Sequence, residues 1–122
     1  MQTVESLSVL DIPEAYKMYI TEFVMNISAI PFISRVILFG SCAKETVTKH
    51  SDIDLFITTD REITEDEEML IAFHSLPPFS VSTIPIDIIV QSESVFTSLV
   101  DQVGMIQKQV IKYGVDLSEL LR

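Results

Sequence analysis

The chain has 122 residues, of which 48% are hydrophobic, so it is long enough for one domain with a buried core and too apolar for a disordered segment. Its 18 acidic and 8 basic residues give a net charge of −10, which disfavours a long nucleic acid as substrate because such binding depends on cationic contacts with phosphates. No apolar stretch approaches the roughly 20 residues of a membrane-spanning helix, and the first residues lack the basic and apolar regions of a signal peptide.

The first predicted element is a helix that begins near Asp11 and ends before Pro31. Asp11 is expected to be the N-cap, Pro13 lies in the first turn, and Glu14 occupies the capping-box position three residues after the cap. The apolar residues of this segment recur at helical spacing and predict one buried face: Ile12, Tyr16, Tyr19, Ile20, Phe23, Val24 and Ile27.

Two strands, separated by a tight turn, follow this helix. The apolar segment Arg35 to Phe39 predicts a strand that ends at Gly40-Ser41, and a short helical turn is expected over Cys42 to Thr46. After a loop, the residues from Asp52 to Thr59 predict the second strand.

The second half of the chain begins with a capping box, Thr64 to Glu67, which opens a helix to about His74. The segment "SLPPFS" is expected to be a loop, and a third strand is predicted from Thr83 to Gln91. Two helices, about Ser94 to Val100 and Gln102 to Tyr113, complete the pattern, and Gly114 occupies the C-cap position of the last one.

This order of elements predicts an α/β (α+β) fold in which a small mixed β-sheet is flanked by helices. Neither a linker nor a repeat interrupts the pattern. We therefore expect a single domain over residues 1–122.

Three aspartates on the predicted strands are candidate metal ligands. Asp52 and Asp54 point to the same side of the second strand because side chains alternate along a strand, and their Cα atoms are about 6.5–7 Å apart. Like charges at this separation repel unless a cation lies between them, and Mg²⁺ prefers carboxylate and phosphate oxygens. Asp87 interrupts a strand that is otherwise apolar, where an unpaired carboxylate is costly.

If the third strand lies beside the second, the three carboxylates converge and can hold two metal ions, the arrangement that supports nucleotidyl transfer. Each aspartate also has an ordinary explanation, which the sequence leaves open. Asp52 would be a turn residue, Asp54 an exposed position on an edge strand, and Asp87 a loop cap or the partner of a lysine.

The turn before these strands fits a phosphate. A strand that ends in Gly40-Ser41 and leads into a helical turn can direct backbone N–H groups and a hydroxyl at a phosphate, and Lys44 adds a positive charge nearby. Phosphate is also what a pair of Mg²⁺ ions binds, so the two features together predict a nucleoside triphosphate. An ordinary strand-to-turn glycine is the alternative.

The pattern formed by Gly40-Ser41, ten intervening residues and Asp52-Ile53-Asp54 resembles the G-S-x10-D-x-D signature of the nucleotidyltransferase superfamily that includes DNA polymerase beta. The surrounding "LFGS…SDIDLFI" resembles the minimal nucleotidyltransferases of bacteria, and Asp87 in "IPIDIIV" matches their third carboxylate. The likeness covers about residues 33–91 and implies a polymerase-beta-like nucleotidyltransferase fold.

The resemblance also implies roles for these residues. Asp52 and Asp54 would bind two Mg²⁺ ions, with Mn²⁺ as a substitute, and Asp87 would bind the catalytic ion and help deprotonate the attacking hydroxyl. Gly40, Ser41 and Lys44 would hold the triphosphate of the nucleotide, commonly ATP. Many relatives have arginine and glycine where this chain has Lys44 and Glu45, and Glu45 brings a negative charge towards the triphosphate.

Minimal members lack an evident acceptor-binding domain, and many are paired with a helical HEPN-type ribonuclease toxin. The leading hypothesis is therefore a cytoplasmic adenylyltransferase, the antitoxin of a toxin–antitoxin pair, which transfers AMP to a hydroxyl of its partner protein. One alternative is a non-catalytic module that neutralises the partner by covering it. Another is the catalytic subunit of a split antibiotic adenylyltransferase. Homo-oligomerisation stays open.

The remaining reactive side chains are predicted to be structural. The single Cys42 excludes an internal disulfide, fits the reducing cytoplasm and is expected to pack rather than react. His50 and His74 lack the spacing of zinc ligands. The tyrosines Tyr16, Tyr19 and Tyr113 are expected in the core or at an interface, and four methionines are expected to pack between helices: Met18, Met25, Met69 and Met105.

Overall fold

The structure of the protein is a computed structural model that describes residues 1–75 and 84–121. The loop predicted for "SLPPFS" lies outside these ranges beyond Ser75, and so does Thr83, the predicted start of the third strand.

Within the described residues, five strands form one sheet in the order β1-β5-β2-β3-β4. The strands are β1 (Gln2–Thr3), β2 (Ile33–Phe39), β3 (Ile53–Thr59), β4 (Ile86–Ser92) and β5 (Val115–Asp116). Since β3 pairs antiparallel with β2 and parallel with β4, the sheet is mixed.

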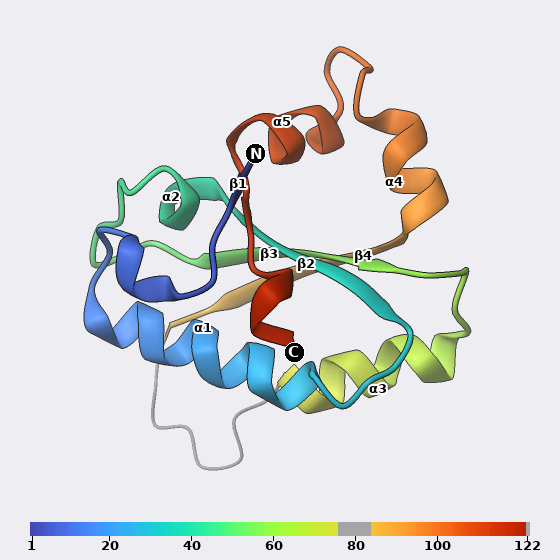
Figure 1. Cartoon of the computed structure of the whole chain (residues 1–122), viewed down its shortest axis with the longest axis horizontal. Helices are drawn as coiled ribbons and strands as arrows, with labels where there is room; N and C mark the ends of the chain where they lie inside the picture. Colours follow the sequence, from blue (N-terminus) through green and yellow to red (C-terminus); the bar gives the residue numbers. More distant parts are fainter. Residues whose placement is uncertain (76–83, 122) are drawn as a thin grey trace.

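Helices cover both faces of the sheet. Figure 1 shows α1 (Glu14–Ile27) and α3 (Glu65–Ser75) on one face, and α4 (Glu93–Leu99) and α5 (Ile106–Tyr113) on the other. The short helix α2 (Gly40–Ala43) follows β2 directly, and two 3-10 helices, η1 (Leu7–Val9) and η2 (Ser118–Leu121), lie near the chain ends. The predicted fold class, a small mixed sheet flanked by helices, is confirmed.

Strand alternation divides the core into two clusters. Ile53, Leu55 and Ile57 of β3 belong to the larger cluster, which contains the buried face of α1. Phe56 faces the opposite side and packs against Phe96 of α4, with ring centroids 4.9 Å apart. Asp54 is two residues before Phe56 and therefore points to the same face of the sheet, the one that carries α4 and α5.

The start of the chain differs from the prediction. The strand β1 and the helix η1 precede α1, whose N-cap is Pro13 without a side-chain hydrogen bond. The predicted capping role of Asp11 is wrong, because α1 begins after Pro13. The backbone N–H of Asp11 donates to Glu45 Oε2 at 3.0 Å. A contact between segments far apart in sequence thus decides how the chain enters α1.

The capping box of α3 is confirmed. The Glu67 N–H donates to Thr64 Oγ1 at 3.2 Å, and the Thr64 N–H donates to Glu67 Oε1 at 3.0 Å. This motif is local in sequence, so the pattern alone was sufficient to predict it.

The prediction that four methionines pack between helices is wrong, because all four are exposed. The exposed fractions of Met18, Met25 and Met69 are 71%, 65% and 68%, and that of Met105 is 40%. The helical spacing was compatible with a packed face, but the buried stripe of α1 is formed by the aromatic and β-branched side chains. None of the described helices combines the length and apolarity that crossing a bilayer requires.

Candidate active site

The sheet brings the aspartates of the two predicted strands together. In the parallel register of β3 and β4, Asp54 and Asp87 are direct Cα partners, so their side chains stand on the same face of neighbouring strands. Asp52 lies immediately before β3, and in the antiparallel pairing Phe39 of β2 lies opposite Asp54. The end of β2, the start of β3 and the start of β4 therefore meet at one edge of the fold.

The three carboxylates interact electrostatically. Partial burial raises the pKa of Asp54 above its ordinary value, and the negative charges of Asp87 and Asp52 raise it further. No lysine or arginine of the described residues forms an ion pair with any of the three. Of the ordinary explanations, pairing of Asp87 with a described lysine is thereby excluded.

Asp87 is more exposed than the sequence predicted. The sequence predicted a fully buried strand, whereas β4 is the edge strand of the described sheet, most of its residues are only partly buried and Asp87 is exposed. The register with Asp54, and not the cost of burial, is what places Asp87 at this site.

The chemistry of these donors fits divalent metal ions. In residues 1–75 and 84–121, no three histidine, cysteine or acidic side chains stand in a ready metal-binding group. However, Asp52, Asp54 and Asp87 supply carboxylate oxygens, the ligands that Mg²⁺ prefers, and a cation would relieve the repulsion that raises the pKa of Asp54. These three residues would hold the metal.

Gly40 contacts this cluster directly. Its φ of +71° is in the left-handed region, and a Cβ atom placed on it would lie 2.3 Å from Asp54 Oδ2. A side chain at this position would therefore collide with the carboxylate. The sequence suggested that glycine permits the approach of a phosphate. The structure shows that glycine is already required without a ligand, because the Asp54 carboxylate lies against this position. Gly40 and Ser41 are the first two residues of α2, which begins two residues earlier than predicted.

Lys44 and Glu45 follow α2 and point to different partners. The Lys44 ammonium lies 5.0 Å from the ring centroid of Tyr113. Glu45 has a φ of 58°, a backbone conformation that favours glycine after a helix, and its carboxylate accepts the Asp11 N–H. The charge of Glu45 is thus partly satisfied by the backbone before α1.

Two residues that the sequence assigned to packing also fix the segment before Asp52. The Tyr16 hydroxyl donates to the Ser51 carbonyl at 2.7 Å, and the Cys42 thiol donates to the Asp52 carbonyl at 3.7 Å. Burial, and then the charge of Asp54, raise the pKa of Cys42 to about 11, so the thiol is protonated and unreactive at neutral pH. Only the choice of tyrosine over phenylalanine at a core position hinted at the role of Tyr16.

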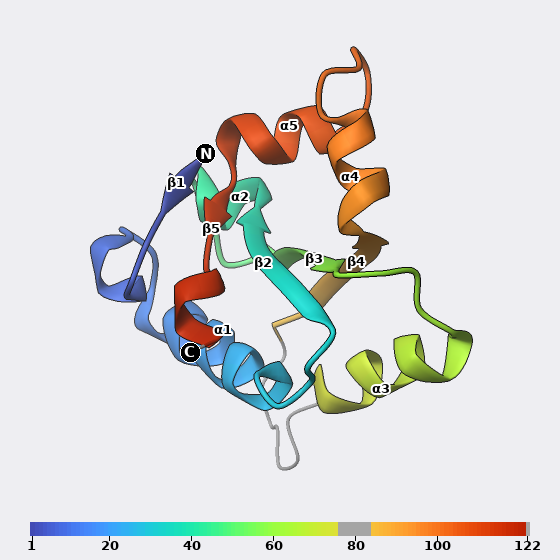
Figure 2. The same cartoon turned by 45° about the vertical axis from the view of Figure 1, so that its right-hand side comes forward.

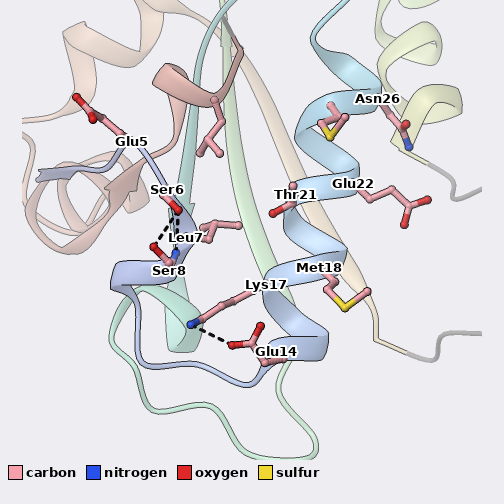
Figure 3. Close-up of a pocket in the computed structure, with 12 residues that line it drawn as sticks. Glu5, Ser6, Leu7, Ser8, Glu14, Lys17, Met18, Thr21, Glu22 and Asn26 are labelled. Atoms are coloured by element: carbon pink, nitrogen blue, oxygen red, sulfur yellow. Dashed lines mark hydrogen bonds and ion pairs between the residues drawn. The ribbon is translucent and has the colours of Figure 1, made fainter.

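Two open grooves lie elsewhere on the described part of the molecule. Figure 3 shows a groove of about 660 Å³ between η1 and α1, lined by Leu7, Met18 and the Lys17–Glu14 ion pair among others. A second hollow of about 360 Å³ lies beside Thr59 and Val95. Neither contains a predicted site residue, so the candidate active site is identified by its carboxylates and not by a cavity.

Comparisons with known proteins identify the family of the chain. A family model described as "Nucleotidyltransferase domain" matches residues 20–117, a span that includes all six predicted site residues. Among solved structures, the chain is similar to a protein from Sulfolobus solfataricus that is provisionally described as a nucleotidyltransferase. The identity is 23%, the TM-score is 0.49, and the likeness covers 66% of this chain and 70% of the other. No curated protein matches the chain.

Proposed function

We propose that this chain, which belongs to the nucleotidyltransferase domain family, is a Mg²⁺-dependent enzyme. The proposed reaction transfers AMP from ATP to a hydroxyl group of a partner protein. The observation that carries this proposal is the register of β3 and β4, which pairs Asp54 with Asp87 beside Asp52 and Gly40. The fold itself gains nothing from three carboxylates at one edge of the sheet, because in this chain they repel each other.

In the proposed reaction, the hydroxyl oxygen of the acceptor attacks the α-phosphorus of ATP. The bond from the α-phosphorus to the bridging oxygen breaks, pyrophosphate leaves, and the hydroxyl proton passes to the Asp87 carboxylate. Asp52 and Asp54 hold the metal ions, and Gly40, Ser41 and Lys44 bind the triphosphate. Bound Mg²⁺ supplies neutralisation of phosphate charge and a lower pKa of the attacking hydroxyl.

We propose a helical HEPN-type toxin in the same cytoplasm as the acceptor, which makes this chain the antitoxin. The support is the resemblance of the motif region to minimal nucleotidyltransferases. A second support is the exposure of Asp87 on the edge strand of the described sheet, where a hydroxyl of another protein can reach it.

The test is transfer of label from ATP carrying a labelled α-phosphate to the protein encoded by the neighbouring gene, with Mg²⁺ present. We expect label on that protein, and we expect Asp54→Asn to remove at least 99% of it, the roughly 10²-fold effect of losing a group that acts in the transition state. Asp60→Asn, which neutralises an exposed aspartate just after β3, is the matched control and should leave the transfer unchanged. Equal transfer by the two variants would contradict the proposal.

A second candidate function, neutralisation of the partner by covering it, is favoured by apolar side chains that α1 and α3 leave exposed. Besides Met18 and Met25 on α1, Met69 and Phe73 on α3 have exposed fractions of 68% and 73%, and the two helices pack together. In this case, a variant carrying Asp52→Asn and Asp54→Asn should still protect cells from the partner. Loss of protection would leave the enzyme as the better account.

A further inference from the structure

We infer that Lys112, at the C-terminal end of α5, completes the nucleotide site and binds the β- and γ-phosphates together with Lys44, while the ring of Tyr113 positions the two lysines. The inference rests on the proposed function and adds two residues from a segment that carries no part of the signature. It assigns Lys112 the two phosphates of the substrate that leave as pyrophosphate.

The first observation is a cluster of two cations on one ring. The ammonium groups of Lys44 and Lys112 lie 5.0 Å and 5.2 Å from the ring centroid of Tyr113. All three residues are exposed, and the exposed fraction of Tyr113 is 44%. Because α2 and α5 are far apart in sequence, the fold and not the local chain brings these cations together.

The second observation is the distribution of charge in an acidic chain. Three of the other described cations form ion pairs with glutamates, namely Lys17, Arg35 and Arg61, whereas Lys49 and Lys108 form none. Within the described part of the chain, neither Lys44 nor Lys112 has a carboxylate at ion-pair distance. What distinguishes these two lysines is that the negative face of one ring attracts both ammonium groups. A ligand with several negative charges can contact both of them at once.

The third observation is the position of this cluster relative to the carboxylates. The Lys44 N–H donates to the Gly40 carbonyl at 3.1 Å, and Gly40 touches Asp54, so the cluster begins one helical turn from the metal-binding groups. Gly114 fixes the other side, because a Cβ atom on it would lie 2.7 Å from the Ile37 side chain. This close packing holds the end of α5 against β2, on the same side as α2 (Figure 2).

The chemistry of the reaction needs cations at this place. If Gly40 and Ser41 hold the triphosphate as proposed, its β- and γ-phosphates would lie near α2, and negative charge would grow on them as the bond to the α-phosphorus breaks. Lysine ammonium groups stabilise that charge without a fixed geometry. Lys112 should therefore affect both the binding of ATP and the rate of the chemical step.

The experiment measures the dissociation constants of ATP, AMP and inorganic tripolyphosphate by calorimetric titration in Mg²⁺. We expect Lys112→Gln to weaken ATP and tripolyphosphate about tenfold, the loss of one charge-assisted contact, and to change AMP binding less than about twofold. Tyr113→Phe keeps the ring and should bind normally, whereas Tyr113→Leu should weaken ATP about threefold because it removes the attraction that holds the two lysines. Lys108→Gln removes the same charge from α5 and is the matched control.

The outcomes separate this inference from the proposed function. If the wild type transfers AMP and Lys112→Gln binds tripolyphosphate as well as Lys108→Gln does, the inference is overturned and the function stands. If Lys112→Gln weakens AMP as much as ATP, the assignment to the polyphosphate is wrong. If the wild type binds neither ATP nor tripolyphosphate, both proposals are overturned. Unchanged melting temperatures of the variants show that the fold is intact.

Discussion

Gly40 and Asp54 depend on each other at the scale of single residues. The left-handed backbone of Gly40 and its missing side chain let the Asp54 carboxylate lie against the end of β2. Asp54 in turn carries a raised pKa, because its charge is partly buried and faces two other aspartates. The geometry that fits a cation is thus unfavourable for the protein without one.

Substitution of Gly40 by alanine tests this contact. We expect Gly40→Ala to lower the free energy of unfolding by about 2–4 kcal/mol, from left-handed strain and a clash with Asp54, and to abolish transfer. Gly104 also has a positive φ, +85°, but no atom lies within 4 Å of the Cβ position. Gly104→Ala therefore measures strain alone and should cost only about 1–2 kcal/mol in the same denaturant titration.

Neutralisation of Asp54 should separate stability from activity. Since the raised pKa means that the charged form is disfavoured in the folded state, Asp54→Asn should raise the melting temperature of the metal-free protein by roughly 2–4 °C at pH 7. Addition of Mg²⁺ should stabilise the wild type and not this variant. A lower melting temperature for Asp54→Asn in the absence of metal would contradict the repulsion described here.

At the scale of elements, α3 shows how a local motif and an ion pair stabilise one helix start. Glu67 completes the capping box with Thr64 and also accepts two hydrogen bonds from the Arg61 guanidinium, at 3.0 Å and 2.7 Å. Hydrogen bonding to Arg61, and then to the Thr64 backbone, lowers the pKa of Glu67 from 4.5 to about 2. The start of α3 therefore depends on an ionised Glu67.

The lowered pKa of Glu67 predicts how the stability of the fold depends on pH. Because the pKa of Glu67 is lower in the folded state, its contribution is present above pH 4.5 and is lost as the pH falls to about 2. Glu67→Gln should melt at a lower temperature than the wild type at pH 7, and the difference should vanish near pH 2. Glu68→Gln removes an exposed charge from the same turn and should show no such pH-dependent difference.

The whole molecule is defined by a mixed sheet with unequal faces and by a net charge of −10. The α1 face contains the larger core cluster, and the α4–α5 face contains a smaller cluster beside the carboxylates. The residues of the proposed site come from segments far apart in sequence: the carboxylates lie on or beside β3 and β4, and the lysines lie at the ends of α2 and α5. The acidic excess should make the stability of the molecule sensitive to dissolved ions.

This excess predicts that salt stabilises the fold. We expect the melting temperature at pH 7 to rise by a few degrees between 10 mM and 300 mM NaCl, because salt screens the repulsion among the acidic residues. Near pH 4.4, the isoelectric point, the net charge is close to zero and the effect should be much smaller. A melting temperature that falls with salt at pH 7 would show that the ion pairs outweigh the repulsion.

The sequence was sufficient where the determining interactions are local. The strand β3 followed from its run of strand-forming apolar residues, the start of α3 from the box of Thr64 and Glu67, and the fold class from the order of elements. The spacing of Gly40-Ser41 and Asp52-Ile53-Asp54 indicated the family that the chain-wide match then showed. For the strand and the helix start, residues a few positions apart contain the whole signal, because strand period and capping act over a few residues.

Only the tertiary structure decided what depends on contacts between distant segments. The two-residue strands β1 and β5 are too short to have a period, the N–H of Asp11 is satisfied by Glu45, and Asp87 joins Asp54 through the register of the sheet. The same holds for Lys44, Lys112 and Tyr113, which are ordinary residues until the fold brings them together. Local propensity carries no information on such pairs, because the two residues interact only after the chain between them has closed into a loop.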